Sequence, residues 1–469
     1  MRRKPARWAA SDHTTCEISC LSLLIIKSPP KGLFWAAPAD GDTDFTPEDP
    51  LALDYLGQQV GLWLFRDLTT RTNRAQNYAV VLYGLYLADR AVSEYGYRGD
   101  DETRVRLFER WEKFWALATL EYRKGNIPLG DADSMRGILG AKRHWTPGDK
   151  PLPLDFTLIS RQSELGGLGA YLSSLRRYGL VGEGSLRVTE RARGILDCFW
   201  SEQGRRDSAK LYEAYALQAL DLSRTVIGRA SGSLTLEGLG RRSRLSTLGE
   251  AGRTQQQDRL WDALFESARD GTTLPLAQQL IKASGLDVVD AETLIDGMLA
   301  ERWGPLAAGV SAKLQAARAF GRLAKEVLGR FNRAYGYVHD HGWTADTADV
   351  ALEAFPSGEM ERLRSLCADM LSVADVARFR KLQFHGPDFV TLIGKLAGAS
   401  DPSSALDQLL AYHRMVQRAR RGGGAWLRDQ QGKLLLQIAD YGGYRYATVF
   451  PDLKFAVVRR LLSDLGRIA

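Results

Sequence analysis

Residues 154–204 read LDFTLISRQSELGGLGAYLSSLRRYGLVGEGSLRVTERARGILDCFWSEQG. Three leucines between residues 168 and 175 have helical spacing, and this helix should end at Gly179, because glycine tolerates the left-handed conformation of helix ends. The glycines of 181–184 predict a tight reversal. Residues 185–189 then alternate between polar and apolar, which is typical of a short half-buried strand.

A second helix should follow this strand, with Thr189 as its cap. Its apolar residues recur on one face and are Ile195, Leu196, Phe199 and Trp200. The order helix, YGLV, short wing, LRVT, helix resembles the second half of a winged helix-turn-helix domain. The resemblance implies a recognition helix at about Gly166–Tyr178 and a wing at Val181–Val188. In winged-helix DNA-binding proteins the helix enters the major groove and the wing touches phosphates.

The resemblance also implies double-stranded DNA as a partner, since arginines in and around the module are suited to phosphate contacts. These candidate DNA-binding residues are Arg176, Arg177, Arg187, Arg191 and Arg193. The helix departs from the family pattern where it begins Gly-Gly-Leu-Gly-Ala, because these side chains carry no donors for base edges. We therefore expect no sequence-specific reading. Many winged helices are protein-docking or structural units, and that alternative stays open.

The composition is that of an ordinary globular protein. A chain of 469 residues with 45% hydrophobic and 25% charged residues should form about three domains. Four cysteines in this length make no disulfide framework, and Cys198 and Cys367 fall in helical patterns typical of buried thiols. No segment reaches the ~18 apolar residues of a membrane span. We expect a cytoplasmic protein.

The net charge of +7 is uneven along the chain. Residues 1–35 carry six basic and two acidic groups, and residues 401–469 carry eleven basic and six acidic groups. The basic excess is therefore confined to the two ends, which indicates local contacts with anions. Near the C-terminus it supplies four further candidate DNA-binding residues, Arg414, Arg418, Arg420 and Arg421.

Repeated helical periodicity predicts a mainly α, multi-domain protein with an embedded winged helix and a C-terminal β-hairpin. β-structure should be confined to the wing and to residues 425–438. The expected segments are a poorly ordered basic extension at 1–44, an N-terminal helical domain at 45–150, the winged helix at 151–204, a helical domain at 205–345 and a C-terminal helical region at 346–469. Residues 1–40 could come from an upstream start codon.

A second resemblance covers residues 64–90, which begin LFRDLTTRTNRAQNYAVVLYGLYL. This phrase resembles a pattern in uncharacterised bacterial proteins of phage-defence and restriction islands, in which a threonine-rich turn precedes a buried helix. Asp67 stands where those proteins usually have glycine, and no catalytic residue can be carried over. Threonines of the turn should cap the helix. Arg71 and Arg74 could hold an anion there, or pair with acidic neighbours such as Asp67.

The best metal or acid–base candidate is the cluster His339-Asp340-His341. Histidine and carboxylate are suitable ligands, but no third ligand is identifiable, and a solvated turn between helices explains the cluster as well. The sequence has no nucleophile elbow, nucleotide loop or dinucleotide fingerprint. We therefore expect no catalytic residues, metal or cofactor, although active sites can assemble from distant positions.

These observations favour a non-enzymatic subunit of a bacterial anti-phage defence or DNA-transaction system, which binds DNA or other subunits of a protein complex. One alternative is an enzyme of nucleic-acid metabolism, such as a nuclease, without a recognisable motif. Another is a winged-helix transcription regulator. The long helical region after the module argues against a regulator, which is more often a short chain.

Overall fold

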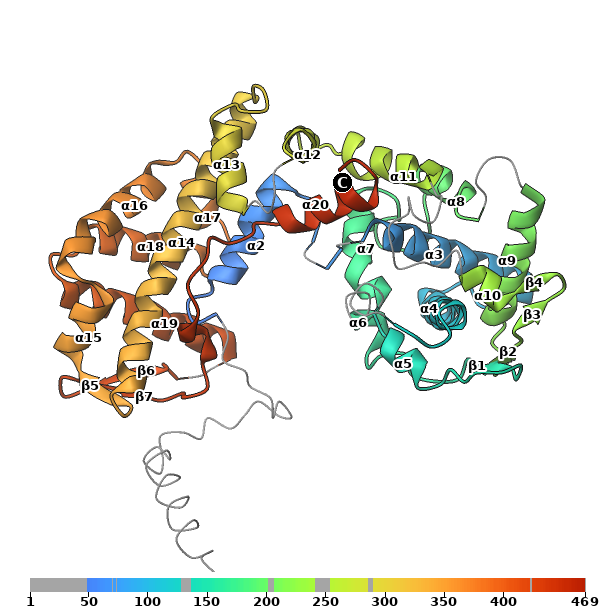
Figure 1. Ribbon diagram of the computed structural model, residues 1–469, viewed down its shortest axis with the longest axis horizontal. Coiled ribbons are helices and arrows are strands. Elements are labelled where there is room, and N and C mark those ends of the chain that lie inside the picture. Colours follow the sequence, from blue (N-terminus) through green and yellow to red (C-terminus); the bar gives the residue numbers. More distant parts are fainter. Residues whose placement is uncertain are drawn as a thin grey trace, which may run out of the picture. The chain divides into compact units, whose positions relative to one another are not determined.

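The computed structural model describes residues 49–69, 71–72, 74–127, 136–200, 206–240, 254–285, 290–421 and 424–468 (Figure 1). The mainly α prediction is confirmed, because helices dominate and the sheets are small and antiparallel. Within these ranges no helix is both long and apolar enough to cross a membrane. The predicted extension at 1–44 lies outside the described residues.

The described residues form two compact units, and each is discontinuous in sequence. The small unit contains residues 49–56 and Arg322–Val449, and the large unit contains Gly57–Gly321 and residues 450–468. The chain passes from one unit to the other within α2 (Leu53–Leu64), within α14 (Ala308–Asp340) and between Val449 and Phe450. This division differs from the consecutive segments drawn from the sequence, because packing joins parts that are far apart along the chain.

The large unit is built mainly of helices. These are α3 (Ala75–Tyr95), α4 (Asp101–Tyr122), α5 (Ile138–Lys142), α6 (Gln162–Leu165), α7 (Gly167–Arg177), α8 (Arg193–Asp197), α9 (Arg206–Leu220), α10 (Leu236–Gly240), α11 (Thr254–Trp261), α12 (Thr273–Lys282), α13 (Ala291–Leu299) and α20 (Phe455–Asp464). Two strand pairs accompany them, β1 (Leu152–Pro153) with β2 (Val226–Ile227) and β3 (Ala230–Ser231) with β4 (Leu234–Thr235).

The core of the large unit is the contact between α3 and α4. As its composition predicts, α3 is buried nearly all round. Trp111 of α4 donates a hydrogen bond to the carbonyl of Val80 at 2.9 Å. Gly84 makes room for this indole, since a Cβ atom there would lie 2.1 Å from the ring. The ring of Tyr83 stacks on Phe199 with centroids 4.1 Å apart, which extends the aromatic core toward α8.

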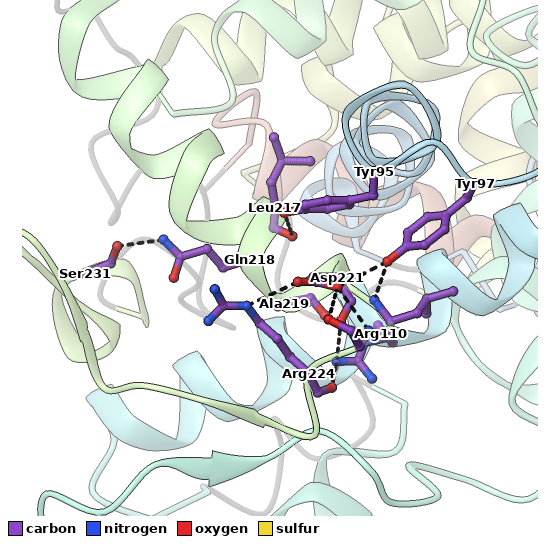
Figure 2. A network of polar contacts seen from close by, with 11 residues as sticks. Tyr95, Tyr97, Arg110, Leu217, Gln218, Ala219, Asp221, Arg224 and Ser231 are labelled. Atoms are coloured by element: carbon purple, nitrogen blue, oxygen red, sulfur yellow. Dashed lines mark hydrogen bonds and ion pairs between the residues drawn. The ribbon is translucent and has the colours of Figure 1, made fainter.

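Arg110 of α4 holds the carboxyl-terminal end of α9 (Figure 2). Its guanidinium donates to the carbonyls of Ala219 at 2.7 Å and Arg224 at 2.6 Å. The Asp221 carboxylate accepts a hydrogen bond from Tyr97 at 3.2 Å. The last carbonyls of a helix have no hydrogen-bond donor within the helix, and a nearby cation stabilises them. Arg110 supplies both the donors and the positive charge.

The small unit contains the second half of α14 and, among the described residues, five further α-helices. They are α15 (Thr347–Ala354), α16 (Met360–Ser372), α17 (Val376–Arg380), α18 (Gly386–Ala397) and α19 (Pro402–Arg421). A sheet of order β5-β7-β6 joins β5 (Thr344–Asp346) to the predicted hairpin, whose strands are β6 (Leu427–Gln430) and β7 (Lys433–Leu436). The hairpin prediction is confirmed. Cys198 in the large unit and Cys367 in this one are buried free thiols, as expected.

Some expectations about local structure are wrong. β-structure is not confined to the wing and hairpin, since β1 to β5 lie elsewhere, while the wing itself has a single β-bridge. Strands of only two or three residues are too short to show alternation in a sequence. Helical periodicity predicts a helix at Ala308–Tyr335, followed by a turn that contains His339. The helix α14 instead continues to Asp340, so His339 lies in its last turn.

The predicted threonine cap of α3 is also wrong, and that of the next helix is right only in position. The N-cap of α3 is Arg74, and Thr72 instead bonds the backbone of Thr69 at 2.9–3.0 Å. Thr189 is the N-cap residue of η2 (Glu190–Ala192), as predicted, but its hydroxyl donates to the carbonyl of Gly179 at 2.6 Å and makes no capping bond to that helix. Hydroxyl groups bond neighbouring backbone in several ways, and the surrounding structure selects one of them.

Candidate functional site

A buried carboxylate of α4 holds the amino-terminal end of α7. Glu112 accepts hydrogen bonds from the backbone N–H of Gly167 at 2.6 Å and from the amide of Gln162 at 2.9 Å. Burial raises the pKa of Glu112 to about 7, against the opposing effect of both hydrogen bonds. The helical periodicity of residues 103–122 predicts that Glu112 lies on the polar side of the helix, and its burial shows that this prediction is wrong. The side chain is the anion at the N-terminus of α7.

Much of α7 is packed inside the large unit. The Tyr171 hydroxyl accepts a hydrogen bond from Asn77 at 3.2 Å, and the hydroxyls of Ser174 and Tyr78 lie 2.8 Å apart. The exposed residues of the helix are Gly169, Ser173 and Arg177. In helix-turn-helix proteins the amino-terminal part of the recognition helix contacts the bases. The exposed surface of α7 therefore offers a cation at its carboxyl end and few groups for base edges.

The segment predicted as a wing is a reversal closed by one bridge between Val181 and Val188. Arg176 donates a hydrogen bond to the carbonyl of Ser185 at 3.0 Å, so this guanidinium holds the reversal in place. Arg187 is exposed, and its side chain has no polar partner within the described ranges. Within this segment Arg187 is therefore the arginine available to an external anion.

Backbone contacts bring exposed arginines from four separate parts of the chain close to Arg66 and residues 267–270. These residues, called the arginine cluster below, are Arg66, Arg177, Arg191 and Arg269. Arg177 donates to the carbonyl of Arg66 at 3.0 Å, and the N–H of Arg66 donates to Asp270 at 3.4 Å. Arg191 donates to the carbonyl of Ser267 at 3.3 Å. Tertiary structure therefore gathers cations that the sequence separates by up to about two hundred residues.

Two carboxylates belong to this neighbourhood. Burial would raise the pKa of Asp270, but hydrogen bonds from Thr273, Thr272 and the N–H of Arg66 hold it below its usual value. The pKa of Asp67 is raised by burial and by the charge of Asp270. Four guanidinium groups outnumber these two acids, so the cluster has a net positive charge.

The remaining predicted arginines have different surroundings. Arg193 pairs with Glu190 at 2.8 Å, and both side chains are exposed. In the small unit, Arg420 donates to the backbone oxygen and the carboxylate of Asp49 at 2.9 and 2.8 Å. Arg414 and Arg418 lie one turn apart on α19 and are exposed. The side chain of Arg421 lies outside the described residues.

The His339-Asp340-His341 cluster lines a cavity of about 980 Å³ in the small unit. His339 Nδ1 lies 3.0 Å from the Tyr444 hydroxyl, which accepts a hydrogen bond from Arg445 at 3.1 Å. The His341 ring stacks on Tyr337 with centroids 3.9 Å apart. Among the described residues no group of three or more potential ligands is placed to hold a metal ion. The imidazole, carboxylate and phenol groups of this cavity are suited to proton transfer.

No family model matches the chain. No curated protein and no solved structure matches it either. The arginine cluster includes two residues that sequence reasoning missed, Arg66 and Arg269. Arg66 lies shortly after the end of α2, and Arg269 lies in the turn before α12. Each is a single exposed arginine beside a helix end, and no local pattern signals that the two meet.

Proposed function

We propose that the chain binds double-stranded DNA through phosphate contacts and without sequence preference, as a non-enzymatic subunit of a bacterial defence or DNA-transaction system. The arginine cluster, together with Arg187 of the wing, carries this proposal. Guanidinium groups bind phosphate oxygens, and neutralising phosphates releases condensed counterions from the duplex. The assignment to a defence system rests on the resemblance of residues 64–90 alone.

The lack of sequence preference follows from what α7 exposes. Glycine and serine side chains present little to base edges, whereas Arg177 at the helix end suits a phosphate. The partners proposed are therefore duplex DNA and the other subunits of the complex. The exposed Arg414 and Arg418 of the small unit are a second place for phosphate contacts.

A salt titration tests the proposal. For the full chain bound to unrelated duplexes, log K should fall linearly as log salt concentration rises. The slope should be about −0.9 for each phosphate contact. The variant to compare replaces Arg66, Arg187 and Arg269 by alanine. The described residues offer no hydrogen-bond or ion-pair partner to these three side chains, so the fold should be unaffected. The slope should flatten by about 2–3.

Arg176, Arg177 and Arg191 are left intact, because their guanidinium groups bond backbone carbonyls. The matched control replaces three exposed arginines outside the cluster, Arg106, Arg143 and Arg302, by alanine. It changes the net charge equally and should keep the wild-type slope. Equal flattening in both variants would mean that overall charge, and not the cluster, governs binding.

Two other outcomes redirect the proposal. If neither variant changes the slope but replacing Arg414 and Arg418 does, the DNA contact belongs to the small unit. If the wild-type chain shows no binding to duplexes even at low salt, the proposal of DNA binding is wrong. The helix–wing segment would then be a protein-docking surface.

A further inference from the structure

A cavity of about 400 Å³ lies in the large unit among α3, η2 (Glu190–Ala192), α8 and α9. It is not part of the arginine cluster, although its wall includes Val188 and Thr189 at the end of the wing. Aromatic side chains form one part of its lining, and carboxylates form another. The function proposed above uses none of these groups.

Three aromatic rings line the cavity, those of Tyr83, Tyr86 and Trp200. Neighbouring rings fix their orientation. Trp200 stacks on Tyr212 with centroids 5.3 Å apart, and Tyr83 lies edge-on to Trp200 at 5.5 Å. Tyr83 and Trp200 are almost fully buried, while Tyr86 is half-buried. These rings give the cavity a rigid aromatic wall.

Four carboxylates line the same cavity, and they are Asp89, Glu190, Asp197 and Glu213. Its wall contains one cation, Arg193, which is paired with Glu190 at 2.8 Å. Behind the wall the buried Arg104 pairs with Asp89 at 2.7 Å. The more exposed Arg90 approaches Glu213 at 3.5 Å. The four carboxylates of the cavity therefore outnumber these three arginines.

Glu213 is held in position on α9. The Tyr86 hydroxyl approaches its carboxylate at 3.5 Å, and Arg110 pins the end of the same helix (Figure 2). Aromatic faces and carboxylates together are the groups that bind organic cations, because the ring quadrupole and the negative charge attract the same positive group. An anionic ligand would meet four carboxylates. The described residues place no set of three ligands for a metal ion.

We propose that this cavity binds a small organic ammonium ion. Its charged nitrogen lies among the carboxylates, with Glu213 as the main partner, and its carbon chain packs against Tyr86 and Trp200. Rigid aromatic walls favour such binding because little side-chain freedom is lost when the ligand enters. The site goes beyond the proposed function and does not depend on it.

Calorimetric titration of the full chain with putrescine, a four-carbon diamine, tests this site. Its matched neutral probe is 1,4-butanediol, which has the same length and no charge. Putrescine should bind with one site per chain and the diol should not. Glu213→Gln should weaken putrescine binding at least about tenfold, since it removes a charge-assisted contact. Tyr86→Phe, which keeps the ring, should bind nearly as wild type does, and Tyr86→Ala should not.

The control is Glu94→Gln, which removes one exposed carboxylate of α3 outside the cavity. It should leave putrescine binding unchanged. The proposal is wrong if the diol binds as well as the diamine, if wild type shows no binding at millimolar putrescine, or if Glu94→Gln weakens binding as much as Glu213→Gln. DNA is absent from every arm, so failure here is separate from failure of DNA binding.

Discussion

At neutral pH the carboxyl group of Glu112 is divided between its protonated and ionised forms, because burial raises its pKa to about 7. The ionised form accepts hydrogen bonds from Gly167 and Gln162, but it has lost the hydration that it has in the unfolded chain. One side chain thus connects the stability of α4 and α7 to pH.

Glu112→Gln should reduce the pH dependence of the unfolding free energy. The pKa is about 7 in the folded chain and 4.5 in the reference state, so the folded chain binds more protons between these values. The contribution of Glu112 to the unfolding free energy is complete below pH 4.5 and is lost as the pH rises through 7. It amounts to about 3 kcal/mol in total. Denaturant unfolding at pH 5 and pH 8 measures it.

Wild type should lose more stability than Glu112→Gln over this interval. Glu102→Gln, an exposed change on the same helix, should behave as wild type does. If Glu112→Gln and wild type lose equal amounts, the ionisation of Glu112 is not coupled to folding.

At the residue scale the sequence predicted apolar burial well and polar contacts poorly. The patterns of residues 168–199 predict five buried residues, Leu172, Leu175, Leu180, Ile195 and Phe199. All are buried except Leu172, which is half-buried. Helical spacing is enough to place such residues. Glu112 was assigned to the polar side by the same reasoning. Its burial depends on Gln162, which is fifty residues away along the chain.

The prediction of helices and strands from the sequence has a similar limit. The long helices α3, α4 and α14 and the hairpin β6–β7 are predictable, because their periodicity extends over many residues. The side-chain contacts at the ends of these helices were not predicted. The carboxylate that binds the N-terminus of α3 is Asp464, which accepts from the N–H of Ala75 at 2.9 Å and pairs with Arg74 at 3.1 Å. An anion was expected there, but Asp67 was the expected partner.

The hairpin, α19 and the segment before α2 meet at His413, which gives a second prediction. Nδ1 lies 2.9 Å from the carbonyl of Pro50, and Nε2 accepts from the N–H of Trp426 at 3.0 Å. Since Nε2 is an acceptor, the proton is on Nδ1 and the ring is neutral. Burial lowers the pKa of His413 to about 4. Protonation would break the contact with Trp426.

Acid should therefore destabilise the small unit through His413. With a folded pKa of about 4 and a reference value of 6.5, this contribution is present above pH 6.5 and is lost as the pH falls through 4, by about 3 kcal/mol. Asp49 acts in the opposite direction, because its pKa is raised to about 6. The comparison of wild type with His413→Gln removes this background. Between pH 7 and 4.5, wild type should lose more stability than the variant does, and parallel curves would contradict the assignment.

At the scale of the whole molecule, residues 450–468 belong to the large unit, although the sequence grouped them with the C-terminal region. Composition could not reveal this, because α20 is an ordinary amphipathic helix. Its buried side chains pack in the large unit, and they are Phe455, Val458, Leu461 and Leu462. The Asp464 carboxylate accepts a hydrogen bond from the N–H of Ala75 at the start of α3. A long-range return of the chain leaves no local signal in a sequence.

Removing residues 450–469 should therefore destabilise the large unit and leave the small unit folded. The deletion takes away the buried face of α20 and the anion at the N-terminus of α3, and lost burial of one large apolar side chain alone costs about 2–5 kcal/mol. Hydrogen exchange measured by peptide should show faster exchange in α3 and α4 and unchanged exchange in α18 and α19. Asp464→Asn is the milder variant, since it keeps the volume and removes the charge, and its faster exchange should be confined to the first turns of α3. If the deletion accelerates exchange equally in α3 and α19, the C-terminal helix stabilises both units, and its assignment to the large unit alone is wrong.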